Sequence, residues 1–316
     1  MRASLLKAAG LAAAALMTVA GCTQAGSTGI AGDALVVLDD DLSLQTVDNI
    51  VPAVNAAAAE PAMIAALDAV SASLDTPTLV DLNRQVVVDR NTSSAVAASF
   101  LDDADLDVAA GSGTGSVVVG AANFAESATL GEIYAGALRA AGYDASVRTI
   151  GNRETYLPAL LAGDEIMVVP EYVGTLTEFL NKRANGPDAP AQASGDLEVT
   201  MAALTALGDD AGLVFGEPAE AADQNAFAVT QAFVDEYEVS TLSELAALDL
   251  DITLGGPPEC PERPFCQPGL EDVYGLTITE FTSLDAGGPL TKAALRAGEI
   301  TLGLVFSSDG ELAAAS

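Results

Sequence analysis

Short apolar runs alternate along this chain with segments in which apolar residues recur every three or four positions. In the first third, this pattern predicts a strand over Ala34–Leu38 and helices over Pro61–Leu74, Thr78–Val88 and Ser93–Leu101. Residues 108–116 (VAAGSGTGS) then have no period and are rich in Gly and Ser, which predicts a linker.

Beyond this linker the pattern becomes a regular alternation of strands and helices. Strands are predicted at Val117–Gly120, Ser146–Ile150, Ile166–Val169, Leu213–Phe215, Ala226–Val229, Ile252–Leu254 and Ile300–Phe306. Helices are predicted at Glu126–Ala141, at Arg153–Ala162 and from Thr241, which has capping-box spacing with Glu244. Two such runs, separated by the polar residues 183–196, predict two α/β lobes with ligand chemistry at the strand ends.

Composition narrows the range of functions. The 316 residues include 45 Asp and Glu against 12 Lys and Arg, a formal charge of −33 at pH 7. This charge argues against a nucleic-acid partner, because binding phosphates needs Lys and Arg. The chain has no His, which excludes imidazole catalysis and His-containing metal sites. Half of the residues are apolar, so we expect a globular chain and not a disordered acidic one.

The first 22 residues have the pattern of an export signal. Arg2 and Lys7 precede an apolar core over Leu11–Val19 that is too short to span a bilayer. The run VAGC, which ends at Cys22, resembles a bacterial lipobox and implies a mature chain with a lipid on Cys22. A plain signal peptide with an incidental Cys is the alternative. Residues 23–33 are small and polar, which predicts a flexible tether to the membrane.

The export signal places the two remaining cysteines, Cys260 and Cys266, outside the cytoplasm. In that compartment a Cys-x5-Cys pair predicts a local disulfide. A dithiol redox pair is the alternative, and it is disfavoured because the spacing is not Cys-x-x-Cys.

Several long strings resemble one protein family. They are VVVGAANFAES, LGEIYAGALRAAGY, IGNRETYLPALLAGDEI and VVPEYVGTL between residues 117 and 176, and GLVFGEPAEAADQNAFAVT, LGGPPECPERPFCQPGLEDVYGL and VFSSDG from residue 212 on. Together they resemble the substrate-binding lipoproteins of osmoprotectant ABC importers, the glycine betaine/choline/carnitine binding family. The resemblance implies a periplasmic-binding-protein type II fold, in which two α/β lobes close on a solute. It also implies a permease partner, a location on the extracytoplasmic face of the membrane, and no catalysis or cofactor.

The order of the segments differs from the family's order. The stretch LVVLDDDLSLQTVDNIVPAV, residues 35–54, resembles the family's C-terminal segment, yet it precedes Val117, where the family begins. The chain therefore resembles a circular permutant in which residues 111–116 (GSGTGS) join the old ends. A short flexible linker of this kind costs little closure entropy.

The permuted order implies a division into lobes. Lobe I is predicted over residues 34–180, in which 34–110 are the family's C-terminal segment and 117–180 its N-terminal segment, and lobe II over 181–316. The same reasoning predicts one covalent crossing between the lobes, near Tyr172–Leu180. The segment Ala34–Asp41 is expected to dock non-covalently as a second hinge strand.

The family implies an aromatic cage for a quaternary ammonium ion. Such an ion has no N–H to donate, so aromatic faces and carboxylates must bind it. The chain has no Trp, which leaves Tyr and Phe as the rings. Tyr172 matches a cage tyrosine of the family, Thr175 matches a ligand-carboxylate contact, and Phe227 and Phe306 stand where members place cage aromatics. For each ring, packing in a core is the alternative.

Polar residues complete the predicted site. Arg263, four residues after Glu259, resembles a cleft pair whose Arg grips a carboxylate of the substrate; an exposed Arg paired with a nearby Glu is the alternative. Tyr156 opens a helix after a strand and is predicted to face the cleft. Arg153 and Glu154, beside it, are either cleft residues or surface charges.

Two departures from the family bear on the solute. In the first loop, Ala122 replaces a Lys of the betaine-binding members, next to Asn123 and Phe124. Asp48 or Asn49 stands near the place of an absent cage tyrosine. A lost cation and a gained acid favour choline over glycine betaine; the alternative is that Asn123 or main-chain N–H groups replace the Lys. The predicted function is therefore solute capture for an ABC importer. A sensory lipoprotein with the same fold and a carboxylate-based hydrolase are the alternatives, and the sequence offers no nucleophile–base pair for an enzyme.

Overall fold

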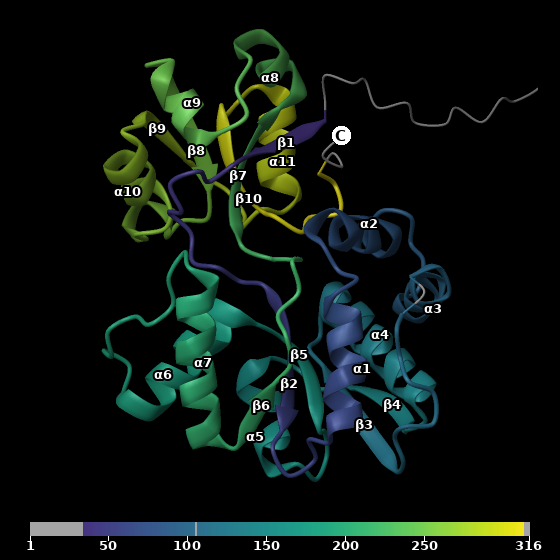
Figure 1. Ribbon diagram of the computed structural model, residues 1–316. Helices are drawn as coiled ribbons and strands as arrows, with labels where there is room; N and C mark the ends of the chain where they lie inside the picture. The colour runs from purple at the N-terminus through teal and green to yellow at the C-terminus, as the bar shows by residue number, and fades with distance from the viewer. Residues whose placement is uncertain (1–33, 105, 313–316) are drawn as a thin grey trace, which may run out of the picture.

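The computed structural model describes residues 34–104 and 106–312, which form two α/β lobes (Figure 1). Lobe I, the lower lobe in Figure 1, is built on a five-stranded sheet of order β4-β3-β5-β2-β6. Its strands are β2 (Ile50–Asn55), β3 (Ser116–Ala121), β4 (Asp144–Thr149), β5 (Val168–Tyr172) and β6 (Leu213–Phe215). Strand β3 pairs in parallel with β4 and β5, whereas β2 runs antiparallel to both of its neighbours.

Helices cover both faces of this sheet. They are α1 (Pro61–Ser71), α2 (Thr76–Val87), α3 (Ser93–Asp103), α4 (Ala125–Ala141), α5 (Arg153–Ala162), α6 (Val173–Asn185) and α7 (Leu197–Ala211). The first four share one apolar core and the last three share the other. Helices α4 and α5 end at Gly142 and Gly163, whose φ values of 111° and 69° are conformations that glycine adopts without strain.

Lobe II has a mixed sheet of order β1-β7-β10-β8-β9. Its strands are β1 (Leu35–Leu38), β7 (Asn225–Thr230), β8 (Asp251–Gly256), β9 (Thr277–Ser283) and β10 (Leu302–Phe306). Its helical segments are α8 (Gln231–Tyr237), α9 (Leu242–Ala247), η2 (Cys260–Glu262), α10 (Gln267–Gly269), η3 (Leu270–Tyr274) and α11 (Pro289–Ala297). The predicted capping box of Thr241 and Glu244 is confirmed at the start of α9.

The chain crosses between the lobes twice, through residues 39–49 and residues 216–224. The two crossing segments run side by side. Asn49 forms an antiparallel bridge with Ala222, and the N–H of Asp223 donates to the carbonyl of Asp48 at 3.1 Å. We call this pair of segments the hinge.

The predicted α/β class and the two-lobed architecture are confirmed, but the structure divides the chain differently. Strand β1 belongs to the sheet of lobe II, although the sequence placed residues 34–180 in lobe I. Helix α7 and strand β6 belong to lobe I, although the sequence placed residues 181–316 in lobe II. The single crossing expected near Tyr172–Leu180 is corrected to two covalent crossings, because β5 and α6 both lie in lobe I.

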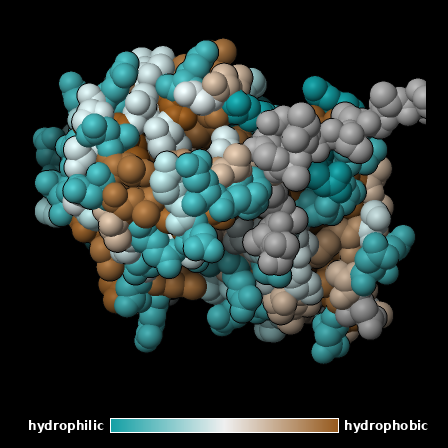
Figure 2. Space-filling model, turned by 90° about the horizontal axis from the view of Figure 1, so that it is seen from above, coloured by the Kyte–Doolittle hydropathy of each residue, from teal (hydrophilic) through white to brown (hydrophobic). Residues whose placement is uncertain are grey.

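The surface of lobe II mixes hydrophilic and hydrophobic areas. Seen from above, hydrophilic side chains cover much of this face, with hydrophobic patches between them (Figure 2).

No single helix in the described ranges is long and apolar enough to cross a bilayer. The consecutive pair α1 and α2 passes that test together only with a bend of 86°.

Candidate ligand-binding site

A cavity of about 360 Å³ lies between lobe I, the hinge and the end of β10. We call it the interlobe cavity. Most of its wall comes from the loops and helix starts that follow β3, β4 and β5, where parallel strands present their carboxyl ends. The lining residues are Asp48, Ala122, Asn123, Phe124, Ser127, Asn152, Arg153, Glu154, Tyr156, Pro170, Tyr172, Thr175, Asp223 and Phe306.

Four aromatic rings line this cavity, and they fall into two kinds. Tyr156 and Tyr172 are buried, and each uses its hydroxyl on a carboxylate inside lobe I. Phe124 and Phe306 are 46% and 37% exposed, and they come from opposite lobes. Large apolar rings that stay accessible in a cavity wall are available to contact a ligand.

A buried ion pair anchors one wall. The side chain of Glu171, on the fully buried strand β5, is 0% exposed and pairs with Arg153 at 2.7 Å. Arg153 also donates from Nε to Glu171 Oε1 at 3.0 Å, and the Tyr156 hydroxyl donates to the same oxygen at 2.8 Å. Arg153 is the only Lys or Arg among the described lining residues. Its positive charge is balanced by Glu171.

Asp48 lies on the hinge beside the start of α6. Its carboxylate accepts the N–H of Thr175 at 2.8 Å and also the Thr175 hydroxyl. Burial raises the pKa of Asp48 to about 6, although the hydrogen bonds from Thr175 oppose this rise. Thr175 is therefore engaged by Asp48 in this structure.

A chain of hydrogen bonds links the hinge to Tyr172. The Ser308 hydroxyl donates to Asp223 at 2.7 Å, and the Ser308 carbonyl accepts from Asn83 at 2.8 Å. Asn83 also donates to one oxygen of Glu126, whose other oxygen accepts the Tyr172 hydroxyl at 2.5 Å. Ser308 follows β10 of lobe II, while the other end of the chain lies in lobe I, so this network spans both lobes.

The structure brings seven of the ten predicted ligand residues into the lining of the interlobe cavity. They are Asp48, Asn123, Phe124, Tyr156, Tyr172, Thr175 and Phe306. Their role in binding stays a prediction. Arg153 and Glu154, for which surface positions were an alternative, also line the cavity.

Three predicted residues lie elsewhere. Phe227 is 1% exposed in the core of lobe II, because β7 is flanked by β1 and β10 and pairs Phe227 with Leu38 and Leu304. Glu259 and Arg263 are exposed on the disulfide loop of lobe II and are not among the lining residues. The Gln45 side chain holds this loop by donating to the carbonyl of Phe265 at 2.9 Å.

The site predicted from the sequence did not include Asn83, Glu126, Glu171, Asp223 or Ser308. Glu171 offered a signal, because a charged residue inside the apolar run VVPEY predicts a buried partner. Asn83 and Ser308 gave none, since they are 225 positions apart and meet only through the packing of the lobes.

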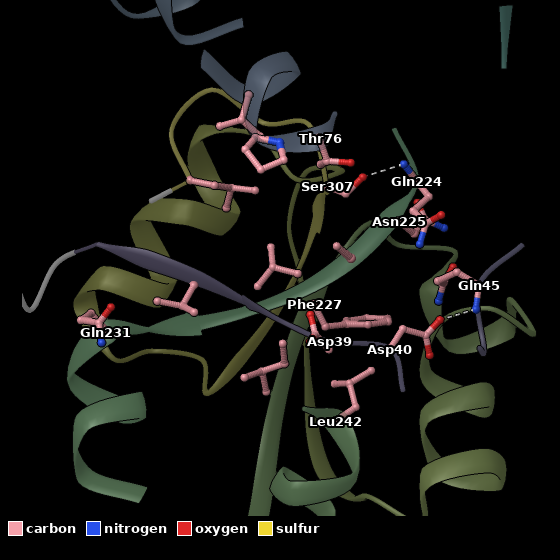
Figure 3. A pocket seen from close by; sticks show the side chains of 17 residues that line it. Asp39, Asp40, Gln45, Thr76, Gln224, Asn225, Phe227, Gln231, Leu242 and Ser307 are labelled. Carbon is pink, nitrogen blue, oxygen red and sulfur yellow. Dashed lines mark hydrogen bonds between the residues drawn. The ribbon is translucent and has the colours of Figure 1, made fainter. Parts of the chain in front are cut away.

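A second, larger cavity of about 550 Å³ lies against β1 and β7, between lobe II and α2 (Figure 3). Phe227 is the only ring among its described lining residues. Two acids, Asp39 and Asp40, line it. Asp40 accepts the N–H groups of Leu44 and Gln45, at 2.8 and 2.7 Å, and the hydroxyl of Tyr274. The interlobe cavity, with four aromatic rings against one, is the better candidate for binding an onium ion despite its smaller volume.

The cysteines give a mixed outcome. Cys260 and Cys266 form the predicted disulfide, with Cα atoms 5.2 Å apart. Cys22, the export signal and the tether lie outside the described residues. Within the described ranges, no group of three or more Cys, Asp or Glu is arranged to hold a metal ion.

Comparison with known protein families shows which family the chain belongs to. Residues 20–103 and 115–316 match the family described as the substrate-binding domain of ABC-type glycine betaine transport systems, OpuAC. The chain belongs to this family. OpuAC proteins are solute-binding proteins of transport systems, and their fold is the periplasmic-binding-protein type II fold predicted from the sequence.

A solved structure shares this fold. YehZ from Escherichia coli, in its apo form, is 23% identical with a TM-score of 0.52, over 62% of this chain and 70% of its own. A protein described as a glycine betaine/carnitine/choline ABC transporter is 20% identical with a TM-score of 0.47, over the same shares of the two chains.

Proposed function

We propose that this OpuAC protein captures a quaternary ammonium solute in the interlobe cavity and delivers it to the permease of an ABC importer. Family membership supports solute binding for transport. The lipobox-like run at Cys22 supports a lipid-anchored position on the extracytoplasmic face of the membrane.

The observation that carries this proposal is the composition of the cavity wall. The lining combines four rings with Asp48, Glu154 and Asp223, and its one cation is neutralised by Glu171. A cation that leaves water needs such surroundings, because aromatic faces and carboxylates replace its hydration. A volume of about 360 Å³ lies within the usual range for small-molecule sites.

The same wall supports choline as the preferred solute. Glycine betaine carries a carboxylate that needs a cation or free donors. Arg153 is bound on two nitrogens to Glu171, and Ala122 supplies no charge. Thr175, the expected carboxylate contact, already donates to Asp48. Choline carries a hydroxyl in place of this carboxylate, so it has no negative charge that needs a cationic partner.

Calorimetric titration at fixed salt tests this proposal. We expect choline to bind at least tenfold more tightly than glycine betaine, and 3,3-dimethylbutanol, the uncharged carbon analogue of choline, to bind far more weakly than either. The analogue has the shape of choline, so the comparison isolates the charge. Equal binding of choline and its neutral analogue, or no binding of any quaternary ammonium solute, would contradict the proposal.

A further inference from the structure

Two acids of the interlobe cavity sit on the two hinge segments. Asp48 lies on the crossing 39–49 and Asp223 on the crossing 216–224, and their backbones are hydrogen-bonded to one another. In the described part of the chain, neither acid forms an ion pair with a Lys or Arg. An entering cation would therefore meet two carboxyl groups that form no salt bridge with a Lys or Arg.

Asp223 is the better placed of the two to respond to a ligand. Its side chain lines the cavity and accepts the Ser308 hydroxyl of lobe II at 2.7 Å. The loop after β10 is joined to the same crossing by Ser307, which donates from its hydroxyl to Ala222 and accepts the N–H of Gln224. Asp223 thus belongs to both the cavity wall and the contact between the lobes.

The groups that act on Asp223 are mostly acids. Glu126 on α4 and Asp48 on the other crossing segment both oppose its negative charge, and Tyr172 at the end of β5 is a neutral phenol. On the loop after β10, the charged Asp309 is paired with Lys292 at 2.7 Å. The lining cation Arg153 is paired with Glu171.

These surroundings favour the neutral form of the Asp223 carboxyl. Glu126 accepts hydrogen bonds on both of its oxygens, from Tyr172 and Asn83. Burial and the charge of Glu126 raise the pKa of Asp223 to about 7.

We propose that Asp223 holds a proton in the ligand-free protein and releases it when an onium cation enters the cavity, so that capture of the solute depends on pH. This inference rests on the proposed function and adds a regulation of the same site. The ionised Asp223 would then favour a cationic ligand over a neutral or a zwitterionic one.

The sign follows from linkage. A bound cation stabilises the ionised carboxylate, so binding removes a proton and affinity rises with pH until Asp223 is ionised in the free protein. With a free-protein pKa of about 7, choline binding at pH 7 releases about half a proton. Affinity rises about 30-fold between pH 5.5 and pH 8. Choline itself has no group that titrates in this range.

Calorimetry of the full chain with choline, in buffers of different ionisation enthalpy at pH 7, measures the protons released. The affinity is measured in parallel from pH 5.5 to pH 8. Asp223→Asn keeps the size of the side chain and the acceptor for Ser308 but removes the titrating carboxyl. We therefore expect the proton release on choline binding and the pH dependence of the affinity to fall by more than half. Asp48→Asn is expected to leave most of the release at pH 7, because the pKa of Asp48 is about 6.

Asp68→Asn is the matched control. Asp68 on α1 also has a raised pKa from burial, and it accepts the N–H of Glu217 outside the cavity lining. This variant should bind choline and release protons as the wild type does. The wild-type titration stands by itself if the Asp223 variant fails to fold.

The outcomes separate this inference from the proposed function. Choline binding with a buffer-independent heat and a constant affinity would overturn the inference and leave the proposed function intact. Proton release that survives in Asp223→Asn but disappears in Asp48→Asn would overturn the assignment to Asp223. Absence of choline binding up to pH 8 would overturn both.

Discussion

Replacing Arg153 by Met should lower the free energy of unfolding by about 3–5 kcal/mol. The change leaves Glu171, whose side chain is 0% exposed, as a buried charge that has lost its cation and keeps only the Tyr156 hydroxyl among its side-chain donors. Urea denaturation at pH 7 measures the loss. Combining the change with Glu171→Gln should recover at least half of it, because the charge is then removed.

Arg148→Met is the matched control for this prediction. Arg148 pairs with Glu165 at 3.2 Å, but both side chains are more than half exposed. Exposed pairs contribute about 0–1 kcal/mol, so this variant should unfold nearly as the wild type does. Equal costs for the two variants would mean that Arg153 does not stabilise the buried carboxylate.

Removing the two accessible rings of the interlobe cavity should weaken choline binding about tenfold each, and about a hundredfold together. Phe124 and Phe306 face the cavity from opposite lobes, and a cation–π contact with each is worth about 0.5–2 kcal/mol. Because both rings are more than a third exposed, Phe124→Ala and Phe306→Ala should unfold thermally close to the wild type. Calorimetric titration with choline gives the affinities.

Phe265→Ala is the control for the ring variants. Phe265 is a similarly exposed ring, 42% accessible, on the disulfide loop of lobe II and outside the cavity lining. Its removal should leave the affinity unchanged. If the double Phe124 and Phe306 variant bound choline as well as the Phe265 variant does, these rings would have no part in the site.

Tyr172 differs from these two rings in the expected effect of its loss. It is 8% exposed, packs in the core of lobe I and bonds Glu126. A Tyr172→Ala change therefore perturbs the fold as well as the cavity. The resemblance implies a cage residue at Tyr172, with core packing as the alternative, whereas the structure makes Tyr172 both a core and a lining residue.

Local signals in the sequence were sufficient for many of the elements. The helix predicted at Arg153–Ala162 has those bounds in the structure, because Gly163 ends it in a left-handed conformation. The strand predicted at Leu213–Phe215 also has those bounds. In each case the residues that fix the element lie within or beside it.

The lobe boundary could not be found in this way. Strand β2 was not predicted, although all six of its residues are buried, because Pro52 within the run does not favour a central strand. Without β2, nothing places β6 in lobe I, where it pairs only with β2. The polar residues 183–196 looked like a domain boundary. Instead, Glu178 on α6 accepts N–H groups of Gln192 and Ala193 and holds this loop to lobe I.

The candidate site, too, could be predicted only in part from the sequence. Family resemblance located Tyr172, Thr175 and Asp48, since each lies in a recognisable string. It misplaced Phe227, whose burial depends on the strands that flank β7. Asp223 could be assigned only when the hinge placed it beside Asp48, 175 positions earlier in the chain.

The circularly permuted order stays a prediction, and two observations support it. The family match is interrupted between residues 103 and 115, where the linker predicted from the sequence lies. The ends of the described chain meet, since Leu35 and Leu312 form a parallel bridge. New termini at that place would need little rearrangement of the fold.

A crystal structure of the mature protein with choline would show which cavity holds the solute. We expect the trimethylammonium group to lie in the interlobe cavity, within about 6 Å of the Phe124, Tyr172 and Phe306 rings, and to face Asp48 and Asp223. Choline in the larger cavity against β1 and β7, or an interlobe cavity occupied by solvent alone at saturating choline, would contradict it.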